Sequence, residues 1–440
     1  MLLFLDVNGT DNSISIAGSM GIIGSIWNKI TYTKALEQSS GKFETIFFES
    51  VYRVTYIGGW SVHDHGIGYR IYSGIIKVTT ALLIMSEIWY LFSESNNLDS
   101  IIDNVNATLI HLIALYRYRN MIKNKAIYKN LSTSMESEYF DPSTKRRKRM
   151  VHFWSQRNER FLILLLSLGF GALSAWHVYP LVDDVEYNLM VAVRFPFSYE
   201  SPFRYCVTYI VTFFVFNYTS LFVMINDLIM QAHLLHLLCQ YTVLADCFRY
   251  IVEDCANVLE TNSFLVDVKE NFIANDLFMT KYLERLHGLV EQHKFILRNT
   301  MDLKRSLNAP MLGQFAASSM LICGISFQAT TTVGISIIKF FMSLLYLMYN
   351  MFELFIFCKW CDEIKIQSQN IGEAAYSSGW EKGISLHPGV RSRLLLVIAR
   401  AQKPLVLTAG GLFELSLESY TTLVKTSYSA LTVLRRFQTE

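Results

Sequence analysis

The last apolar stretch of the chain carries charges whose types and spacing suggest chemistry. Glu414 and Glu418 are one helical turn apart if this stretch is a helix, and Lys425 lies seven residues further on, nearly on the same face. Charged side chains inside an apolar helix are costly, so they either pair or serve a function. Two interpretations stay open: the charges form pairs within a helix bundle, or they link two halves of one moving helix.

Three further residues of this stretch, Ser427, Leu431 and Leu434, share one helix face at spacings of four and three. Such a stripe is common in ordinary helix packing. The alternative is a pore, because a ring of apolar side chains from several copies of a helix excludes water and closes a channel.

No other pattern indicates catalysis. Cys358 and Cys361 form a lone C-x-x-C, which we interpret as two thiols at the inner end of a membrane helix rather than a redox or zinc site. We interpret His63 and His65 as loop or interfacial histidines rather than metal ligands, and the sequence contains no H-E-x-x-H, P-loop or G-x-S-x-G motif. We therefore expect no catalytic residue, no metal and no cofactor.

Composition places these residues in a membrane protein. The chain has 440 residues, of which 52% are hydrophobic and 17% are charged, whereas a soluble domain carries about 25% charged residues. Apolar runs that are long enough to span a bilayer cover residues 69–92, 100–118, 161–181, 205–229, 311–333 and 334–358. From Leu405 to Arg436 there is no proline, and we predict one helix of about 48 Å there, half of it in the cytoplasm and half in the membrane.

The distribution of Lys and Arg predicts the orientation of these seven helices. The N-terminal segment and the connections at 121–157, 236–305 and 359–403 hold 28 Lys and Arg residues, and the three alternate connections hold 2. Basic loops stay on the cytoplasmic side, so the N-terminus is predicted inside and the C-terminus outside. The run Lys145–Arg149 alone is typical of a nuclear signal or a nucleic-acid patch. Between two apolar spans it favours an orientation signal, and we expect no nucleic-acid partner.

We predict an all-α integral membrane protein with six segments. They are a cytoplasmic N-terminal segment (1–66), membrane helices one to four (67–235), a cytoplasmic helical anchor segment (236–305), membrane helices five and six (306–358), a second anchor segment (359–403), and the seventh helix with an extracellular C-terminus (404–440).

The C-terminal sequence resembles that of a known protein family. The stretch PLVLTAGGLFELSLESYTTLVKTSYSALTVLR, residues 404–435, is similar to the final helix of insect odorant receptors. The segment IGEAAYSSGW, residues 371–380, matches the acidic-Tyr-x-x-x-Trp signature that this family carries just before that helix. The resemblance is strong over residues 371–440 and consistent in topology elsewhere. It implies a tetrameric channel whose seventh helix lines an ion pore and whose helices extend into a cytoplasmic anchor domain.

The resemblance also implies a function: an odorant-sensing subunit of a ligand-gated, non-selective cation channel in the plasma membrane of olfactory sensory neurons. The implied partners are a co-receptor subunit in a hetero-tetramer, a small volatile odorant, membrane lipid and permeant cations. The family's co-receptor has a long insertion between its fourth and fifth spans, which residues 237–307 are too short to hold. We therefore predict a tuning subunit.

The resemblance assigns candidate site residues. The pore or gate would comprise Ser427, Leu431, Leu434 and Arg435, with a constriction near Leu431, and a gating linkage would comprise Glu418 and Lys425. In this family the ligand lies among the second, third, fourth and sixth helices, in a pocket that needs apolar walls and one or two hydrogen-bonding groups. The candidate ligand-binding residues are Asn104, Thr108, Phe170, Gly171, Ser174, Trp176, Tyr209, Phe213, Phe216, Met342, Tyr346 and Tyr349.

Two other classes stay open at this point. A seven-span G-protein-coupled chemoreceptor would have the opposite orientation in the membrane. A gustatory-receptor-type channel is the nearest relative of the family, but its T-Y and Q-F signature near the end is absent here. A transporter is disfavoured because no spans are broken by Gly or Pro at mid-depth in repeated positions.

Overall fold

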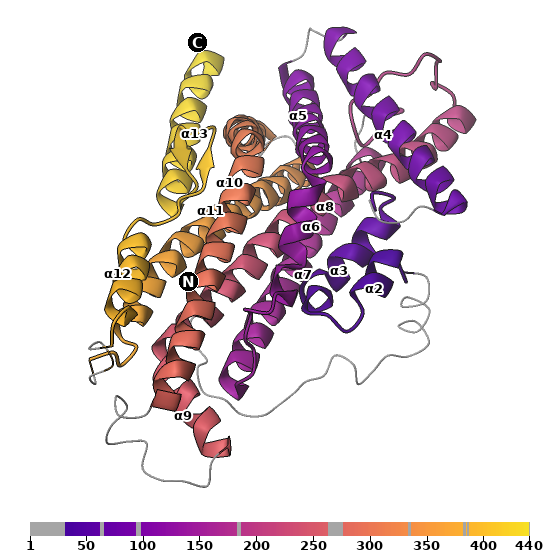
Figure 1. Cartoon of the computed structure of the whole chain (residues 1–440). Helices are drawn as coiled ribbons and strands as arrows, with labels where there is room; N and C mark the ends of the chain where they lie inside the picture. Colours follow the sequence, from indigo (N-terminus) through magenta and orange to yellow (C-terminus); the bar gives the residue numbers. More distant parts are fainter. Residues whose placement is uncertain are drawn as a thin grey trace.

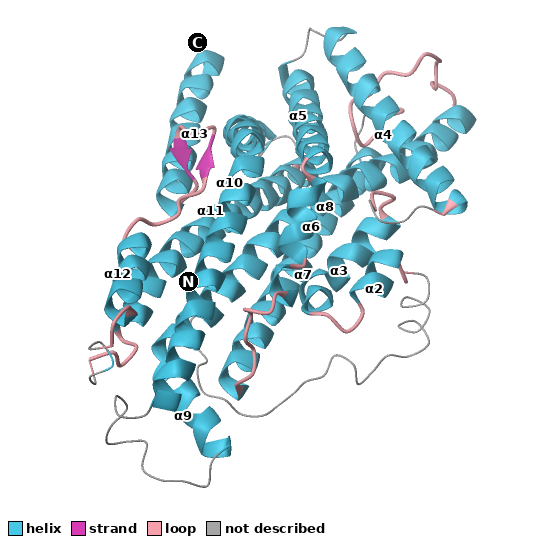
Figure 2. Cartoon of the chain, in the orientation of Figure 1, coloured by secondary structure: helices cyan, strands magenta, loops and turns pink. Residues whose placement is uncertain are grey.

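The computed structural model describes residues 31–61, 66–93, 98–182, 186–262, 276–332, 336–381, 384 and 387–439, and most of them are helical (Figures 1 and 2). The described elements are α2 (Lys34–Ser39), α3 (Phe43–Ile57), α4 (Ile67–Ser93), α5 (Leu98–Lys123), α6 (Lys125–Ser132), η2 (Ser134–Glu136), α7 (Lys145–Val182), α8 (Pro202–Arg249), α9 (Ile251–Asn262), α10 (Asp276–Thr332), α11 (Ile337–Tyr376), α12 (Val390–Ala401), β1 (Thr408–Ala409), β2 (Phe413–Glu414) and α13 (Leu417–Thr439).

The predicted first six apolar runs lie in helices wherever they are described, and several of these helices are far longer than a bilayer requires. With 48 residues in α8 and 57 in α10, their lengths are roughly 72 and 86 Å, against about 30 Å of bilayer hydrocarbon. Both helices run without a break through the predicted segment borders at 235/236 and 305/306. One set of helices therefore builds both the membrane part and the part that projects from it.

Among the described residues, five helices are long and apolar enough to cross a membrane: α4, α7, α8, α10 and α11. The helices α5 and α13, with 26 and 23 residues, are long enough but more polar. In α5 the polar residues Asn104, His111 and Arg117 are buried, because α4, α8 and α10 pack around this helix. Their burial explains how a helix of low hydropathy is placed among membrane helices.

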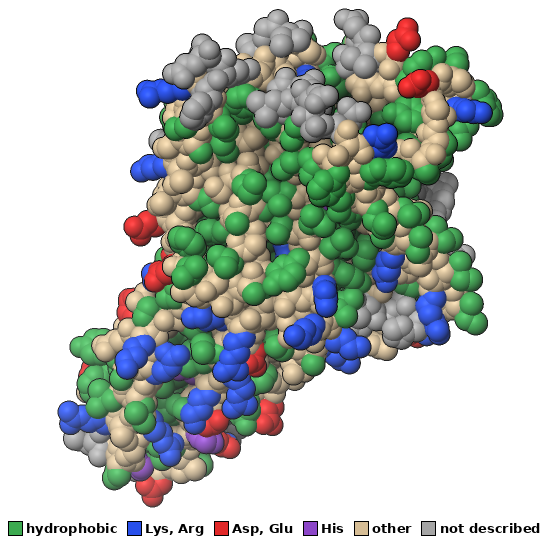
Figure 3. Space-filling view, turned by 90° about the horizontal axis from the view of Figure 1, so that it is seen from above, with side chains coloured by type: hydrophobic (Ala, Val, Ile, Leu, Met, Phe, Trp, Pro, Cys, Tyr) green, Lys and Arg blue, Asp and Glu red, His purple; other side chains and the backbone are tan. Residues whose placement is uncertain are grey.

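The outer surface of the membrane part is apolar. On α4 a stripe of exposed hydrophobic side chains recurs every three or four residues, which is the spacing of one helix face; it comprises Ile71, Ile75, Val78, Leu82, Met85 and Trp89. In Figure 3 hydrophobic side chains cover much of the centre and upper right of the molecule, whereas Lys and Arg crowd the lower left. An exposed apolar stripe of this length is suited to contact with lipid tails.

A fully buried stretch of core lies in the projecting part. The five consecutive α8 residues from Leu234 to Leu238 have no exposed surface, so this part of α8 is covered on every face. The helices α3, α7, α10 and α11 pack around α8. Burial, together with the charge of a neighbouring histidine, lowers the pKa of His236 on this segment to about 3, so its imidazole stays neutral in the core.

A proline inside α10 is accommodated by a neighbouring helix. Pro310 has no N–H to donate to the carbonyl of Ser306, one helical turn earlier. The side-chain amide of Asn120 in α5 donates to that carbonyl at 2.7 Å. The contact satisfies the freed acceptor and fixes α5 against α10 where the two parts of the molecule meet.

The prediction of one continuous helix from Leu405 is wrong. The strands β1 and β2 form an antiparallel hairpin, and α13 begins only at Leu417. Gly410 and Gly411, between the strands, both have positive φ, a conformation that glycine adopts without strain. Asn308 of α10 holds the turn, because its carbonyl accepts from the Gly410 N–H at 2.8 Å and its side chain accepts from the Gly411 N–H at 2.9 Å.

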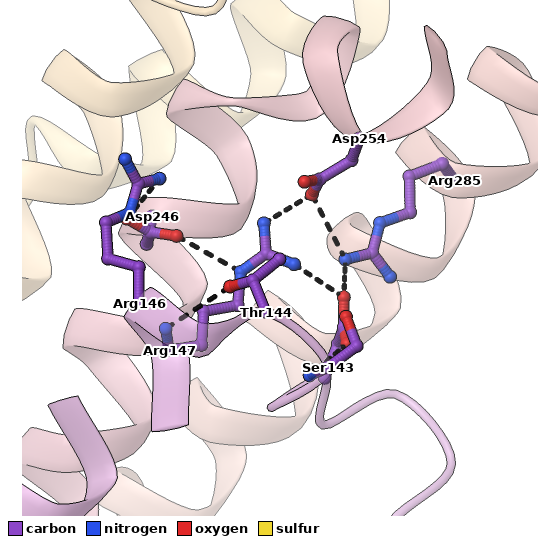
Figure 4. A network of polar contacts seen from close by, with 8 residues as sticks. Ser143, Thr144, Arg146, Arg147, Asp246, Asp254 and Arg285 are labelled. Carbon is purple, nitrogen blue, oxygen red and sulfur yellow. Dashed lines mark hydrogen bonds and ion pairs between the residues drawn. The ribbon is translucent and has the colours of Figure 1, made fainter. Parts of the chain in front are cut away.

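The basic run at the start of α7 contributes to packing as well as to surface charge. Lys145, Lys148 and Arg149 are exposed, but Arg147 is buried. The Arg147 guanidinium forms ion pairs with three carboxylates from three separate segments of the chain (Figure 4): Asp141, Asp246 and Asp254. Arg285 of α10 joins the same group through Asp141. This ionic network fastens the first turn of α7 to α8, α9 and α10.

We predict that Arg147→Met destabilises the protein by about 3 kcal/mol, because it removes the buried cation that three carboxylates share and leaves them only the more exposed Arg146 and Arg285. The apparent melting temperature of detergent-solubilised protein measures this effect. Lys148→Met, at the exposed neighbouring position, is the control and should change the melting temperature little. Equal effects of the two substitutions would show that the ionic network is not what holds α7 in place.

Candidate functional site

A cavity of about 60 Å³ lies between α5, α7, α8 and α11 in the membrane part. Its walls are mainly aliphatic and aromatic, which suits a small apolar molecule. It is lined by Ala107, Ile110, His111, Gly169, Ala172, Leu173, Trp176, Phe216, Ser220, Val223, Met224, Tyr346 and Tyr349.

Three aromatic rings form one side of the cavity. Trp176 stacks on Phe216 with ring centroids 5.5 Å apart, and it meets Tyr346 edge-to-face at 5.6 Å. These are favourable aromatic geometries. Gly169 lets the α8 side chain of Met224 approach α7, since a Cβ there would lie 2.5 Å from the Met224 methyl group. The shape of the cavity therefore depends on three aromatic rings on one side and on the absence of a side chain at Gly169 on another.

The structure brings four of the predicted ligand-binding residues to the cavity: Trp176, Phe216, Tyr346 and Tyr349. Tyr209, Phe213 and Met342 lie outside its wall. The Tyr209 hydroxyl donates to the His177 carbonyl at 2.8 Å, and Phe213 packs on the His177 ring at 4.3 Å.

Three predicted residues of α7 turn away from the cavity. Phe170 and Ser174 are exposed, and the Ser174 hydroxyl donates to the Phe170 carbonyl one turn earlier. Gly171 has no atom within 4 Å of the position where a Cβ would lie. The sequence prediction failed for these three because composition marks an apolar helix without indicating which side of it faces the bundle.

Asn104 and Thr108 are structural. The buried Asn104 amide donates to the carbonyls of Glu87 and Ala192 at 3.1 and 2.8 Å, and the Thr108 hydroxyl donates to Asn104 Oδ1 at 3.4 Å. Asn104 thus ties α4, α5 and the segment before α8 together. Both N–H groups of the Asn104 amide are already hydrogen-bonded within the protein. We therefore assign Asn104 a structural role in place of the predicted ligand contact.

Sequence reasoning missed a buried pair beside the cavity. His111 Nδ1 of α5 lies 3.0 Å from a carboxylate oxygen of Glu87 in α4, and both side chains are buried. His111 also lines the cavity. A glutamate inside the first apolar run was the available signal, since ionisable residues inside membrane helices mark functional positions by default.

A second missed group lies beneath the cavity. Arg117 of α5, near the end of the second predicted apolar run (100–118), is buried and forms ion pairs with Asp227 of α8 at 2.6 Å and Glu353 of α11 at 3.1 Å. Gln314 of α10 donates to the same Glu353 oxygen at 3.0 Å. The Tyr349 hydroxyl donates to Asp227 at 3.0 Å, so one cavity residue belongs directly to this buried ion cluster.

On α13 the predicted pore face turns inward. Ser427 and Leu431 are buried in the protomer, and the Ser427 hydroxyl donates to the Ser319 carbonyl of α10 at 3.2 Å. Leu434, one turn further, is exposed, as is Arg435. A side chain that packs within its own protomer cannot line a pore formed between protomers. The exposed side of α13 carries instead a polar stripe, which comprises Lys425, Ser429, Thr432 and Arg436.

The expected pairing of charges on this helix is also absent within the described protomer. Glu414 belongs to β2 and pairs with Lys365 of α11 at 3.1 Å, so it is not one helical turn from Glu418. Glu418 and Lys425 are both exposed, and the described residues provide neither with an ion-pair partner. The linkage between Glu418 and Lys425 remains a hypothesis that the contacts of one protomer do not support.

Together the long apolar helices and the apolar cavity between them define a helical membrane receptor for a small molecule. The family model described as 7tm Odorant receptor matches residues 97–428. The chain therefore belongs to the insect odorant receptor family.

Named relatives and a solved structure agree with this family. The chain is 24% identical to Odorant receptor 10 of Aedes albopictus over 74% of this chain and 82% of that protein. It is also 24% identical to Odorant receptor 13a of Drosophila melanogaster, over 77% and 81%. Its fold is similar to that of the olfactory receptor OR5 from Machilis hrabei, solved in complex with eugenol, with a TM-score of 0.72, 17% identity, and coverage of 90% of this chain and 99% of that one.

We predict that Tyr349→Phe lowers the stability of the protein by roughly 2 kcal/mol, because it removes a hydrogen bond to a buried carboxylate. Tyr346→Phe is the matched control, since the Tyr346 hydroxyl donates to a neutral acceptor, the Asn106 carbonyl, at a longer distance of 3.4 Å. Thermal unfolding of both variants in detergent tests the difference. A Tyr346→Phe effect as large as that of Tyr349→Phe would contradict it.

Proposed function

We propose that this chain is an odorant-binding tuning subunit of a ligand-gated, non-selective cation channel. A small volatile molecule binds in the cavity between α5, α7, α8 and α11, and its binding opens a pore lined by α13. The observation that carries the proposal is the cavity itself, which has aromatic and aliphatic walls and few polar groups. Membership of the odorant receptor family supports the ligand class.

The cavity suits a neutral volatile on physical grounds. Such a ligand contributes mainly buried apolar surface, at roughly 25 cal/mol per Å², and the rings of Trp176, Phe216 and Tyr346 provide it. A charged ligand would be excluded by the cost of desolvation. The named ligand of the similar solved structure, eugenol, is likewise a small, mainly apolar molecule.

The pore is proposed to form on the exposed side of α13. A water-filled path needs polar side chains along at least part of its wall, and the stripe from Lys425 to Arg436 provides hydroxyl groups at Ser429 and Thr432. In this arrangement the inward face with Ser427 and Leu431 holds α13 against α10. The gate that we placed at Leu431 from sequence is then replaced by a constriction elsewhere along the exposed side.

The polar stripe also bears on the partners. Four identical copies would place four Lys425 ammonium groups around the axis, where they would repel cations. Within the described protomer Lys425 is exposed and no carboxylate pairs with it. We therefore propose that the chain assembles with the co-receptor subunit, in the plasma membrane of olfactory sensory neurons, so that fewer than four such charges surround the pore.

We predict clear odour-evoked current when this chain is expressed with the co-receptor and little or none when it is expressed alone. Whole-cell recording across a panel of volatiles measures this, with surface labelling to match expression. Lys425→Gln is the informative variant: it should raise the current of the chain expressed alone if charge repulsion limits that assembly. Robust current from the unmodified chain alone would overturn the proposal about partners.

We predict that a cationic thiol reagent applied from outside reduces the current of Thr432→Cys but not that of Ser427→Cys. Thr432 lies on the exposed side of α13 and Ser427 on the side packed against α10. The unmodified channel controls for native cysteines, of which Cys206 is exposed. Modification of Ser427→Cys with Thr432→Cys unaffected would instead restore the pore face predicted from sequence.

A further inference from the structure

The buried pair of Glu87 and His111 stands at the polar end of the proposed odorant cavity. The side chains of Glu87 and His111 are 0% and 3% exposed, and His111 Nδ1 lies 3.0 Å from Glu87 Oε2. His111 lines the cavity, and its ring meets the cavity residue Phe216 at an angle of 79°, with ring centroids 6.4 Å apart. The pair therefore brings two ionisable groups from α4 and α5 to the edge of an apolar space.

The second ring nitrogen of His111 is available to a ligand. Nδ1 is directed at Glu87, and no described residue forms a hydrogen bond with Nε2. The hydroxyl groups of the cavity are occupied or less directional, and the indole N–H of Trp176 is a further donor that the variants below leave unchanged. Tyr349 donates to Asp227 at 3.0 Å, Tyr346 makes a long contact to the Asn106 carbonyl, and the small hydroxyl of Ser220 can both donate and accept.

The protonation of the pair decides whether Nε2 of His111 donates or accepts a hydrogen bond. A net charge buried at this depth is costly, so the pair is most stable when it is neutral as a whole. Three arrangements are neutral: a carboxylate beside an imidazolium, a carboxylic acid that donates to Nδ1 of a neutral imidazole, and a carboxylic acid that accepts from Nδ1–H while its other oxygen carries the proton. The third is unfavourable, because Glu87 Oε1 is buried and no described residue would accept its proton. In the first two the remaining ring proton is on Nε2. The pair therefore presents an N–H donor to the cavity whichever side holds the shared proton.

We propose that His111, oriented by Glu87, donates a hydrogen bond from Nε2 to the ligand, and that this chain selects volatiles with a carbonyl oxygen, such as ketones, aldehydes and esters. This inference rests on the proposed odorant-binding function of the cavity. A carbonyl oxygen accepts one directional bond and presents no hydroxyl proton. An alkene of the same shape leaves the N–H unpaired, and an unpaired buried donor is unfavourable.

The glutamate has a positioning role in this arrangement. Without a partner on Nδ1, a neutral imidazole can carry its proton on either nitrogen and the ring can rotate. Glu87 is buried on α4 and is the described side chain that fixes Nδ1. It does not line the cavity, so it acts on the ligand only through His111.

The experiment compares compounds that differ only in the acceptor. Channels formed with the co-receptor are tested with pairs in which a methylene group replaces the carbonyl oxygen, such as 2-heptanone with 2-methyl-1-heptene, and acetophenone with α-methylstyrene. The carbonyl compound of each pair is expected to be about five- to ten-fold more potent on the unmodified chain, which is the usual effect of one hydrogen bond.

The variants test the two residues. Glu87→Met combined with His111→Leu removes the pair without leaving a buried charge unpaired, and it is expected to abolish the carbonyl preference while alkene sensitivity remains. His111→Gln keeps an amide donor and is expected to retain part of the preference. Surface labelling normalises expression, and the comparison within the unmodified chain is decisive even if a variant does not reach the surface.

The outcomes separate the two proposals. Equal potency within the pairs on the unmodified chain, or a preference that survives the double substitution, would overturn the role of His111 and leave the odorant-binding function standing. Absence of current with every volatile, despite surface expression with the co-receptor, would overturn the odorant-binding function and this inference with it.

Discussion

A buried arginine joins four helices near the inner ends of the predicted membrane runs. The Arg117 guanidinium on α5 is surrounded by Asp227 on α8 and Glu353 on α11, at 2.6 and 3.1 Å. Three charges out of water are tolerated only if their geometry is maintained. One cation faces two carboxylates, so neutral donors must stabilise the second negative charge, and Gln314 and Tyr349 provide them. The cluster thereby constrains four helices, α5, α8, α10 and α11, at one level.

The proposed odorant cavity and α13, the proposed pore helix, both depend on that constraint. Tyr349 forms part of the cavity wall and also donates to the ion cluster, so the cluster positions one wall of the proposed odorant cavity. On the other side, Gln314 belongs to α10, and five residues further along α10 the Ser319 carbonyl accepts from Ser427 of α13. A continuous set of contacts thus joins the proposed odorant cavity to the proposed pore helix. If Tyr349 moved, either the ion cluster around Arg117 or helix α10 would have to shift with it.

The projecting part provides a rigid support for these contacts. There α8 is enclosed on all faces, and the Arg147 network fastens α7 to α8, α9 and α10. The Asn120 amide satisfies the carbonyl left free by Pro310, so α10 passes through its proline without losing contact with α5. Because the same helices continue into the membrane, this packing fixes the relative positions from which the cavity is built. By contrast, the exposed apolar stripe on α4 has no protein neighbour within the described protomer and relies on lipid.

The sequence by itself determined that this is a membrane protein, where its long helices lie and which family it belongs to. The reason is that the length of a hydrophobic run and the C-terminal sequence motif are local properties of the chain. It also indicated aromatic cavity residues such as Trp176 and Tyr346. Tertiary structure alone decided which side of each helix faces inward: Phe170 and Ser174 face out, whereas Ser427 and Leu431 face α10. It also decided the partners of Glu87, Arg117 and Asn104, since these contacts join residues far apart in the chain. Apolar composition is nearly uniform around a membrane helix, so its orientation is set by the neighbours that pack against it and by the buried polar groups that must find one another.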